Sequence, residues 1–343
     1  MGDSTTKLLE ALLHPVEALL EKADTENKDW LKGAELTPEE QAAALKQMRR
    51  MELAVFGVLD QQRRHYLARI KALPVLTKSG GPFKLSVPAH GVDDSIVSGL
   101  VYMLSSFVFA EDEKYVDDLA AAYQKTAPPF FKEVAALSAQ AVKGSTVNKV
   151  SVLTRRADDW LKEHKIKFAR EVTTTTHNAV VEVLRSSLAS GADRTANDLV
   201  HALPQFFKQD SLAARAAALS KVKDVELYNE MYANLEKDKA FEMYRARRIA
   251  RTETIPAMNA AKLEGWRQSE VVVGKEWMCG RGPRSRPAHI EADGQVVPLD
   301  EPFIVGGERL MHPGDSSLGA TAKNTINCRC TMRAKVRAQM KQP

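Results

Sequence analysis

The spacing of apolar residues changes along this chain after about Gln268, and that change constrains the fold more than any other feature. Before this point, apolar residues recur every three or four positions, as they do on one face of a helix. After it, short β-rich runs such as Val271–Val273 alternate with turn residues. The pattern predicts a mainly α protein, with an all-α N-terminal body and a small C-terminal α+β module.

The longest helical pattern begins with a complete start signal. Thr37 can cap the helix, Pro38 suits its first position, and Glu40 can complete a capping box. We expect this helix to run to about Leu73, because the apolar residues that follow form one stripe. The stripe consists of Met51, Val55, Leu59, Tyr66, Ile70 and Leu73.

Breaks in this pattern divide the chain into four parts. The run Ser79-Gly80-Gly81-Pro82 is typical of a linker. We therefore predict an N-terminal helical arm over residues 1–73, a linker over 74–93, a helical body over 94–243 and an α+β module over 244–337.

Four prolines are expected to interrupt helices, because proline lacks the backbone N–H and clashes with the preceding turn. They are Pro15, Pro128, Pro129 and Pro256. The expected helices cover residues 7–22, 130–142, 154–190, 195–208 and 211–254, with one that begins near Asp94 and a short one from Pro256 to about Gln268.

Two turn signals and one alternating segment predict the strands of the module. Asp293-Gly294 and Gly306-Gly307 are each expected to form a hairpin. In the last segment apolar and polar residues alternate, which predicts a half-buried strand with a cationic outer face. Its inner residues are Cys330, Met332, Ala334 and Val336, and its outer ones are Thr331, Arg333, Lys335 and Arg337.

Composition is that of a globular protein without a membrane span or a secretion signal. The chain is 44% hydrophobic and 27% charged, and no run approaches the roughly 18 apolar residues that a membrane helix needs. Asp3 and Lys7 precede an amphipathic stretch where a signal peptide would have an apolar core. Three cysteines are too few for a disulfide framework, so the cytoplasm is the expected compartment.

Positive charge gathers toward the C-terminus. From Met243 to Pro343 the chain has 17 Lys and Arg against 10 Asp and Glu, whereas the rest has 32 against 34. A basic module can lie against an anionic partner such as nucleic acid or an acidic protein surface. A solvated basic surface explains the same excess, so both interpretations stay open.

The module also carries an ordered series of arginine, histidine, asparagine, aromatic and cysteine residues. The series is Arg251-Thr252-Glu253, Asn259, Trp277, Arg284-x-Arg286-x-x-His289, Gly294, Phe303, Pro313 and Asn327-Cys328-Arg329-Cys330. In order and spacing it resembles the C-terminal module of the phage Mu F-like head morphogenesis proteins, which are minor head proteins of tailed bacteriophages. Family members often carry an Asp directly before the first Arg of the Arg-x-Arg pair. This chain has Pro283 there, which puts a role for such an Asp in doubt.

The resemblance implies a minor structural protein of the phage head that acts in head morphogenesis at or near the portal vertex. The expected partners are the portal protein, the major capsid protein or both, together with packaged double-stranded DNA contacted without base preference. The expected location is the virion, after assembly in the host cytoplasm, and no enzymatic activity is expected. The N-terminal helices are a candidate docking arm.

Arg251, Glu253 and Arg286 are candidates for an ion-pair network between helix and sheet. A guanidinium donates two parallel hydrogen bonds to a carboxylate, and charges at such a junction need partners. In the alternative interpretation the arginines contact DNA phosphates.

Cys328 and Cys330 would point the same way from a strand, which suggests a metal site. Cys279, His289 or His312 would complete a tetrahedral zinc centre. No second Cys-x-x-Cys pair accompanies them, so small buried thiols are the other interpretation. We expect no cofactor and keep zinc as the alternative.

A hydrolytic site would use His289 as general base, beside His312 and Asn327. The chain lacks a Ser-His-Asp constellation, a phosphate loop and a Glu-bearing metal motif. A structural hydrogen-bonding role for His289 is therefore preferred, and Asn327 is expected to cap a turn through its side-chain amide. The competing function is a metal-dependent hydrolase or nuclease, or a toxin-like effector, that uses the same module.

Overall fold

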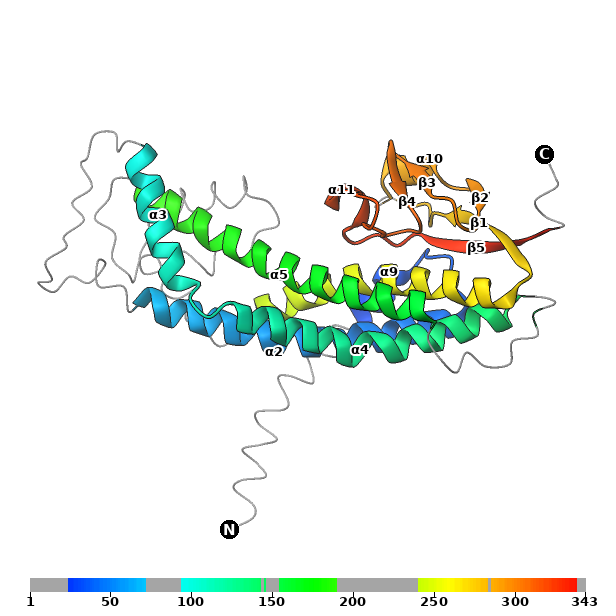
Figure 1. The fold of residues 1–343 in the computed structure, drawn as a ribbon, viewed down its shortest axis with the longest axis horizontal. Helices are drawn as coiled ribbons and strands as arrows, with labels where there is room; N and C mark the ends of the chain where they lie inside the picture. The colour runs from blue at the N-terminus through cyan, green and yellow to red at the C-terminus, as the bar shows by residue number, and fades with distance from the viewer. Residues whose placement is uncertain are drawn as a thin grey trace, which may run out of the picture. The chain divides into compact units, whose positions relative to one another are not determined.

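The computed structural model describes residues 24–71, 94–142, 145, 154–189, 240–282 and 285–337. Its long helices are α2 (Pro38–Lys71), α3 (Asp94–Val108), α4 (Glu113–Gln140), α5 (Arg155–Ala189) and α9 (Ala240–Ser269) (Figure 1). Several predictions fall outside the described residues: the helices over 7–22 and 195–208, most of the helix over 211–254, the linker over 74–93, and Arg284.

Short elements follow α9 and form the α+β module. They are β1 (Val272–Met278), α10 (Pro287–Glu291), β2 (Val296–Pro298), β3 (Phe303–Val305), β4 (Glu308–Leu310), α11 (Ala322–Thr325) and β5 (Thr331–Val336). The predicted fold class, mainly α with a small C-terminal α+β module, is confirmed.

The molecule divides into two compact units, each built from segments that are far apart in the sequence. The first unit gathers Met1–Val55, Ala122–Lys165 and Arg245–Pro343, and the second gathers Phe56–Ala121 and Ile166–Tyr244. The α+β module therefore shares a unit with the start of α2 and with the helical residues 24–31. The four-part division along the sequence stays a prediction.

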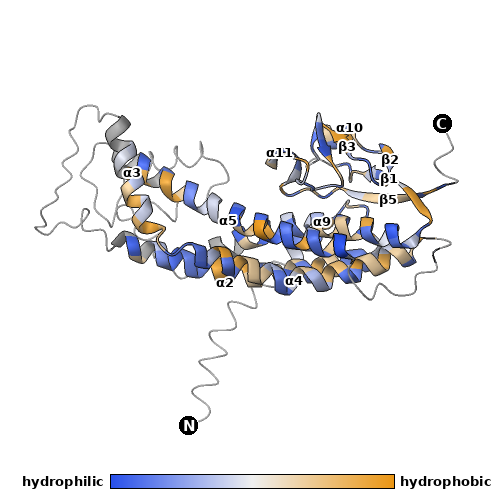
Figure 2. Cartoon of the chain, in the orientation of Figure 1, coloured by the Kyte–Doolittle hydropathy of each residue, from blue (hydrophilic) through white to orange (hydrophobic). Residues whose placement is uncertain are grey.

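Helix α2 begins with the predicted capping box. The backbone N–H of Thr37 donates to the Glu40 carboxylate at 3.1 Å, and the backbone N–H of Glu40 donates to the Thr37 hydroxyl at 3.2 Å. These two bonds satisfy N–H groups that a helix start would otherwise leave free. Both α2 and α4 carry hydrophobic and hydrophilic residues along their length (Figure 2). None of the described helices is long and apolar enough to cross a membrane.

The prediction that prolines interrupt the helices is wrong for those the structure describes. Helix α4 runs through Pro128 and Pro129, and α9 runs through Pro256. Proline inside a helix costs about 3 kcal/mol or more, so other interactions must offset that cost. In α4 the next two residues, Phe130 and Phe131, are buried in the core, and their burial anchors the helix directly after the prolines.

Pro256 also joins α9 to the module. A Cβ atom on Gly314 would lie 2.8 Å from Cγ of Pro256, so only a glycine allows the loop after β4 to approach the ring this closely. Gly314 also has φ +81°, a backbone conformation that favours glycine. The ring of Pro256 thus serves as a packing surface for the loop after β4.

The module contains an antiparallel three-stranded sheet in the order β2-β1-β5 and a separate β3-β4 pair. Strand β1 continues past Gly274, beyond the β-rich run Val271–Val273 that the sequence indicated. Pairing on both sides explains the extension, because Gly274 lies opposite Pro298 of β2 and Lys335 of β5. The neighbouring strands supply the stabilisation that this glycine lacks by itself.

Of the two predicted hairpins, one is confirmed. Gly306 and Gly307 both have positive φ and connect β3 to β4. Asp293 and Gly294 form a turn, but it connects α10 to β2, so the hairpin prediction there is wrong. Pro287 begins a short helix in place of the expected strand, as proline commonly does at a first helical position.

The core of the module is apolar and includes side chains of α9 and of all the strands except β2. Its buried members are Leu263, Trp266, Val272, Trp277, Cys279, Ala292, Leu299, Phe303, Val305, Leu310, Cys328, Cys330 and Met332. On another side α9 approaches α4 closely, because a Cβ on Gly265 would lie 2.2 Å from the Ala135 carbonyl oxygen. Helix α9 is thus fixed between a helix and a sheet within the first unit.

The second unit has a polar contact buried among aromatic rings. The Tyr66 hydroxyl donates to the Asp112 carboxylate at 2.6 Å and accepts a hydrogen bond from the Gln62 amide at 2.9 Å. His177 also contacts Asp112, and its ring stacks on Phe109 with centroids 4.1 Å apart. Burial, together with the neighbouring carboxylate, raises the pKa of Tyr66. These contacts link α2 to α5 inside this unit.

Candidate functional site

Two of the three cysteines of the chain contact one histidine inside the module, and the third contacts one of those two cysteines. Cys279 directly follows β1, His289 lies in α10, and Cys328 and Cys330 precede β5. The four side chains are buried and the thiols are free. We call these four residues the thiol–histidine cluster. It contains every residue that the sequence had suggested for a metal except His312.

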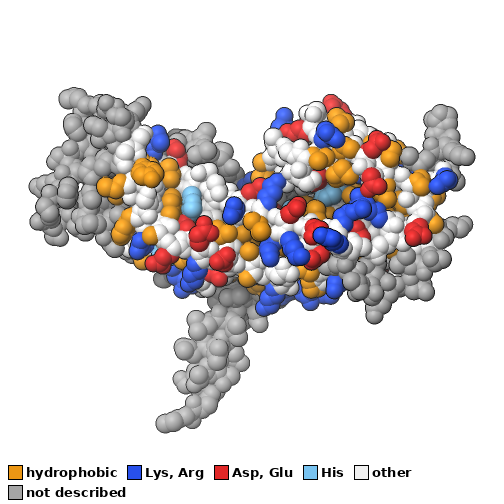
Figure 3. All heavy atoms as spheres, in the orientation of Figure 1, with side chains coloured by type: hydrophobic (Ala, Val, Ile, Leu, Met, Phe, Trp, Pro, Cys, Tyr) orange, Lys and Arg blue, Asp and Glu red, His pale blue; other side chains and the backbone are white. Residues whose placement is uncertain are grey.

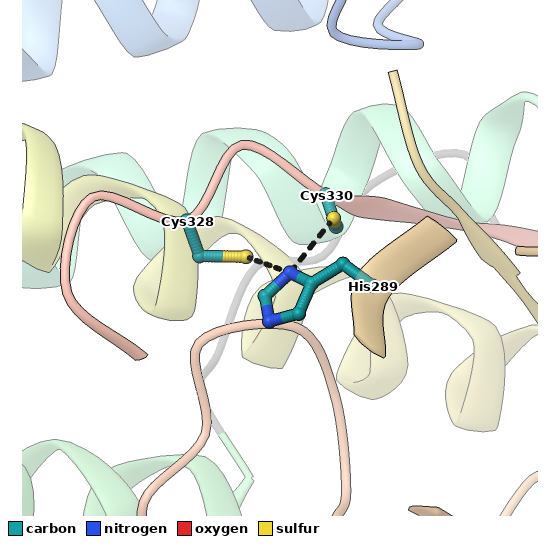
Figure 4. Close-up of side chains that lie close together, drawn as sticks. All are labelled: His289, Cys328 and Cys330. Carbon is teal, nitrogen blue, oxygen red and sulfur yellow. Dashed lines mark hydrogen bonds between the residues drawn. The ribbon is translucent and has the colours of Figure 1, made fainter. Parts of the chain in front are cut away.

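One nitrogen of His289 faces two of the thiols (Figure 4). Its Nδ1 atom lies 3.3 Å from Sγ of Cys330 and 3.7 Å from Sγ of Cys328. These three potential ligand atoms lie within 4.8 Å of one another. The Cys279 thiol hydrogen-bonds with Cys330, so it adjoins the same group.

The other ring nitrogen fixes the protonation pattern of His289. Its Nε2 atom lies 3.2 Å from Oδ1 of Asn324. The amide nitrogen of Asn324 donates to the Val305 carbonyl at 3.3 Å and to the Glu308 carboxylate at 2.8 Å, so its oxygen must face the ring. Nε2 therefore carries the proton and Nδ1 keeps a free lone pair. Asn324 was not anticipated, because no spacing pattern connects it to His289.

Contacts among the thiols shift their pKa values in opposite directions. The hydrogen bond with Cys330 lowers the pKa of Cys279 to about 7. The same kind of contact, together with His289, lowers the pKa of Cys328. The pKa of Cys330 is raised, because its thiol hydrogen-bonds with both of the other sulfurs.

Asn259 ties α9 to the loop that carries the last cysteine. Its amide nitrogen donates to the carbonyls of Pro313 at 3.1 Å and Cys330 at 3.2 Å. Its oxygen accepts from the Thr331 hydroxyl at 3.2 Å, and that hydroxyl accepts from Lys262 Nζ at 2.9 Å. Thr331 is thus buried, although the strand pattern had placed it on the outer face, because these polar partners satisfy its hydroxyl.

Trp277 fills the centre of the module. It is completely buried and packs edge-on against Phe303, with ring centroids 5.3 Å apart, and against His289, at 5.6 Å. Edge-to-face contacts of this kind favour one arrangement of the rings. Trp277 thus holds the imidazole of the thiol–histidine cluster in place.

A second group of polar residues joins α9 to the N-terminal helices within the first unit. Arg247 donates through Nε to Glu52 at 3.1 Å and pairs with Glu26 through Nη1. Arg251 donates through Nε to the Asn27 amide oxygen at 2.7 Å, and the Asn27 amide nitrogen donates to Glu52 at 3.5 Å. We call these five residues the ionic seam.

The predicted ion-pair network of Arg251, Glu253 and Arg286 is wrong in its pairing. Arg251 lies in the ionic seam, Glu253 contacts His164 at 2.7 Å, and Arg286 donates to the carbonyl oxygen of Ile326. Residues two positions apart on a helix point in different directions, which separates Arg251 from Glu253. Arg286 therefore stabilises the loop beside α10, and other residues join the helix to the sheet.

The loop of the module that carries Cys328 and Cys330 also holds the N-terminal segment. Arg329, between the two cysteines, donates to the carbonyls of Trp30 at 3.3 Å and Lys32 at 3.2 Å. A Cβ on Gly280 would lie 1.7 Å from the Gly33 carbonyl oxygen, so the two backbones are in close contact. Residues at both ends of the module thus contact the same N-terminal segment.

The residues suggested for a hydrolytic site have separate surroundings. His312 is buried, its Nδ1 lies 3.2 Å from the Pro313 carbonyl, and its burial lowers its pKa. His289 is engaged with thiols and Asn324. Asn327 has φ +54°, and its backbone N–H donates to the Thr252 hydroxyl at 3.2 Å. Its Oδ1 has no hydrogen-bond partner within the described structure, so this oxygen does not cap the turn.

Many basic side chains of the module have acidic partners in the chain. Examples are Arg267 with Asp300 at 2.8 Å, Arg281 with Asp293 at 2.8 Å, Lys335 with Glu276 at 2.9 Å, and Arg333 with Glu276 at 3.7 Å. The strand face predicted to be cationic is thus partly neutralised by Glu276 of β1. On the face seen in Figure 3, Lys and Arg are interspersed with Asp and Glu.

Comparisons with known proteins find one family and two relatives that are similar to parts of this chain. Residues 215–333 match the model of the family described as Phage Mu protein F like protein. The uncharacterized protein YqbB of Bacillus subtilis (strain 168) is 26% identical over 245 residues, which are 70% of this chain and 67% of that protein. No solved structure matches.

A shorter similarity involves an enzyme. The NAD(+)–arginine ADP-ribosyltransferase EFV of Enterococcus faecalis (strain ATCC 700802 / V583) is 30% identical over 89 residues. These are 25% of this chain and 18% of that protein, so the chain spans less than a fifth of the enzyme's length.

Proposed function

Residues 215–333 of this chain match the model of the Phage Mu protein F like family, and on that premise we propose that the protein is a minor head protein of a tailed bacteriophage. It acts in head morphogenesis at or near the portal vertex. The observation that carries this proposal is the family match, which includes every residue of the ordered series from Arg251 to Cys330.

The contacts of those residues support a structural role. Asn259 positions the loop that carries Cys330, and Trp277 positions His289. Arg251 and Arg329 hold the N-terminal segment. A series of residues whose side chains bind other parts of the same chain is expected in an assembly protein. An enzyme would instead aim several of them at a common reacting atom.

The finer part of the proposal concerns the partners. We place the portal protein and the major capsid protein first, and packaged double-stranded DNA second. The acidic partners of Arg267, Arg281 and Lys335 leave less positive charge for phosphates than the composition suggests. DNA contact should therefore be weak, without base preference, and lost as salt rises.

Quantitative mass spectrometry of purified virions and empty proheads, from the phage that encodes this chain, tests the proposal. We expect a few copies per particle in both, which places the protein in the head before DNA enters. Crosslinking within the same particles should then join it to the portal or capsid protein. Absence from both particles contradicts the proposal.

The enzymatic alternative predicts turnover. Either the module hydrolyses nucleic acid, or it transfers ADP-ribose as the name of the Enterococcus faecalis relative states for that protein. The similarity covers too little of that enzyme to carry its activity over to this chain. Nuclease and NAD-consumption assays on the full chain decide the point, and turnover that is lost in a His289→Ala variant favours the alternative.

A further inference from the structure

Two thiols compete for one nitrogen inside the module. With its proton on Nε2, His289 has a single lone pair on Nδ1. The sulfurs of Cys328 and Cys330 approach that atom at 3.7 Å and 3.3 Å. One lone pair accepts only one good S–H hydrogen bond. A hydrogen bond to Nδ1 therefore explains why one of the two sulfurs lies close to it, but not why both do.

The two distances between Nδ1 of His289 and the sulfurs fit a tetrahedral metal site. Zinc binds a thiolate sulfur at about 2.3 Å and an imidazole nitrogen at about 2.0–2.1 Å, so two such ligands on one ion lie about 3.6 Å apart. The two distances from Nδ1 bracket this value. A small displacement of the side chains around an ion would therefore bring all three atoms to bonding distance.

The surroundings of His289 are those of a metal-bound imidazole. A ligating histidine usually donates its other N–H to an oxygen that fixes the ring. Oδ1 of Asn324 accepts this hydrogen bond. Asn324 is itself oriented by Glu308, whose carboxylate also accepts from Thr321 through the backbone N–H at 3.0 Å and the hydroxyl at 2.7 Å. The imidazole is thus aligned before any ion binds.

Cys279 is the remaining donor beside this group. It is buried and its thiol hydrogen-bonds with Cys330. From these contacts we propose that Cys279, His289, Cys328 and Cys330 bind one zinc ion. Three thiolates and one imidazole form a closed structural site with no position left for water or substrate.

Such an ion would connect the beginning of the module to its end. His289 and Cys328 are 39 residues apart in the sequence, and Cys279 follows the strand that pairs with β5. Since the unfolded chain does not hold these residues together, zinc binding stabilises the folded module. This inference does not depend on the proposed head function, since the metal content is measured on the isolated protein.

The first test uses the full chain, produced in zinc-supplemented medium without a polyhistidine tag. Elemental mass spectrometry should find about one zinc per chain. Removal by a chelator should lower Tm, and added zinc, but not magnesium, should restore it. Cobalt substituted for zinc should show thiolate-to-cobalt charge transfer in the near ultraviolet and the visible bands of a tetrahedral ion. A chain that holds no zinc and keeps its Tm in chelator overturns the proposal. So does a disulfide between any two of the cysteines in the freshly purified protein.

Variants then assign the ligands. His289→Ala and Cys328→Ser should each lose most of the bound zinc, whereas His312→Asn, a change to a buried histidine outside the cluster, should retain it. If Cys279→Ser retains zinc with an unchanged cobalt spectrum, the assignment of that residue as fourth ligand is wrong. If a variant does not fold, release of zinc from the wild-type chain by titration of its thiols with a mercurial still tests the proposal, because zinc should leave as the three thiols react.

Asn324 gives a sharper test of the geometry. Asn324→Ala should weaken zinc affinity about 10- to 100-fold while leaving the stoichiometry at saturating zinc unchanged. The matched control is Lys323→Ala, an exposed neighbour on the same short helix. Equal zinc affinities in the two variants would contradict the role assigned to Asn324.

Discussion

The α+β module and the ionic seam lie in the same compact unit, yet their interiors are opposite in kind. The module is filled by apolar rings and thiols around Trp277, whereas the seam buries a carboxylate and a guanidinium, Glu52 and Arg247. Apolar burial stabilises in proportion to area, whereas a buried ion pair roughly offsets its own desolvation. The comparison suggests that the module supplies stability and that the seam selects which N-terminal segment packs against α9.

The ordered series of residues divides between these two regions. Asn259, Trp277 and His289 serve the module, whereas Arg251 belongs to the seam. Arg329 lies in the module between the two cysteines, and its side chain holds the N-terminal segment that the seam also contacts. Residues of the same ordered series therefore stabilise two different regions, the core of the module and the contact with the N-terminal segment.

The largest effect is expected from Trp277→Ala. Removing a completely buried indole should lower the free energy of unfolding by about 3–5 kcal/mol, because the cavity also loosens Phe303 and His289. Denaturant unfolding followed by circular dichroism measures this. Ile304→Ala, at a side chain 51% exposed in the same module, should change it by less than about 0.5 kcal/mol. Similar losses in both variants would mean that the module core does not carry the stability.

Arg247→Met should cost about 3 kcal/mol, because it leaves the Glu52 carboxylate buried without its cation. Burial already raises the pKa of Glu52 in the wild type. A further rise in the variant makes the loss largest at neutral pH and smaller as pH falls and the carboxyl group is protonated. The double variant Glu52→Leu/Arg247→Met should regain most of the stability. A double variant as unstable as the single one would show that the seam stabilises through the pair itself.

Lys275 makes a smaller, pH-dependent difference inside the module. Burial lowers its pKa to about 8 from 10.5, although Nζ donates to the Met311 carbonyl at 2.7 Å. Above about pH 8 the folded chain releases this proton while the unfolded chain keeps it until about pH 10.5. Stability relative to Lys275→Met should therefore rise with pH across that window, by at most about 3 kcal/mol. Unfolding measured at several pH values checks this, and a constant difference contradicts it.

The smallest effects compare two helix glycines. Gly265→Ala should cost about 1–3 kcal/mol, because its Cβ would lie 2.2 Å from the Ala135 carbonyl oxygen. Gly57→Ala in α2, where nothing lies within 4 Å of the added Cβ, should instead stabilise by about 0.5–1 kcal/mol. Thermal unfolding of both variants shows whether each substitution lowers or raises the free energy of unfolding. A stabilised Gly265→Ala protein would show that α9 and α4 do not need this close approach.

Some of the fold was predictable because its signals are local. The capping box at Thr37, the long helix after it and the Gly306-Gly307 hairpin each depend on residues only a few positions apart. The errors arose where distant contacts outweigh local preference. Phe130 and Phe131 keep α4 continuous through its prolines, and paired strands carry β1 past its glycine.

The candidate site shows the same division. The sequence singled out His289 and the three cysteines because their residue types suit a metal, but it gave no reason to choose zinc over inert thiols. The structure brings the sulfurs of Cys328 and Cys330 to one nitrogen of His289 and supplies Asn324 to orient that ring. The acceptor Asn324 was invisible beforehand, since hydrogen-bond partners 35 residues apart leave no periodic trace.

By itself, the sequence determined the class of fold, the resemblance of residues 215–333 to a known family and the residues able to bind a metal, because periodicity, order and residue chemistry are properties of the sequence. Only the tertiary structure decided which charges pair, that Arg251 and Arg329 hold the N-terminal segment, and that the thiols converge on His289. These outcomes depend on which polar groups are buried next to one another, and that is determined only when distant segments of the chain pack together.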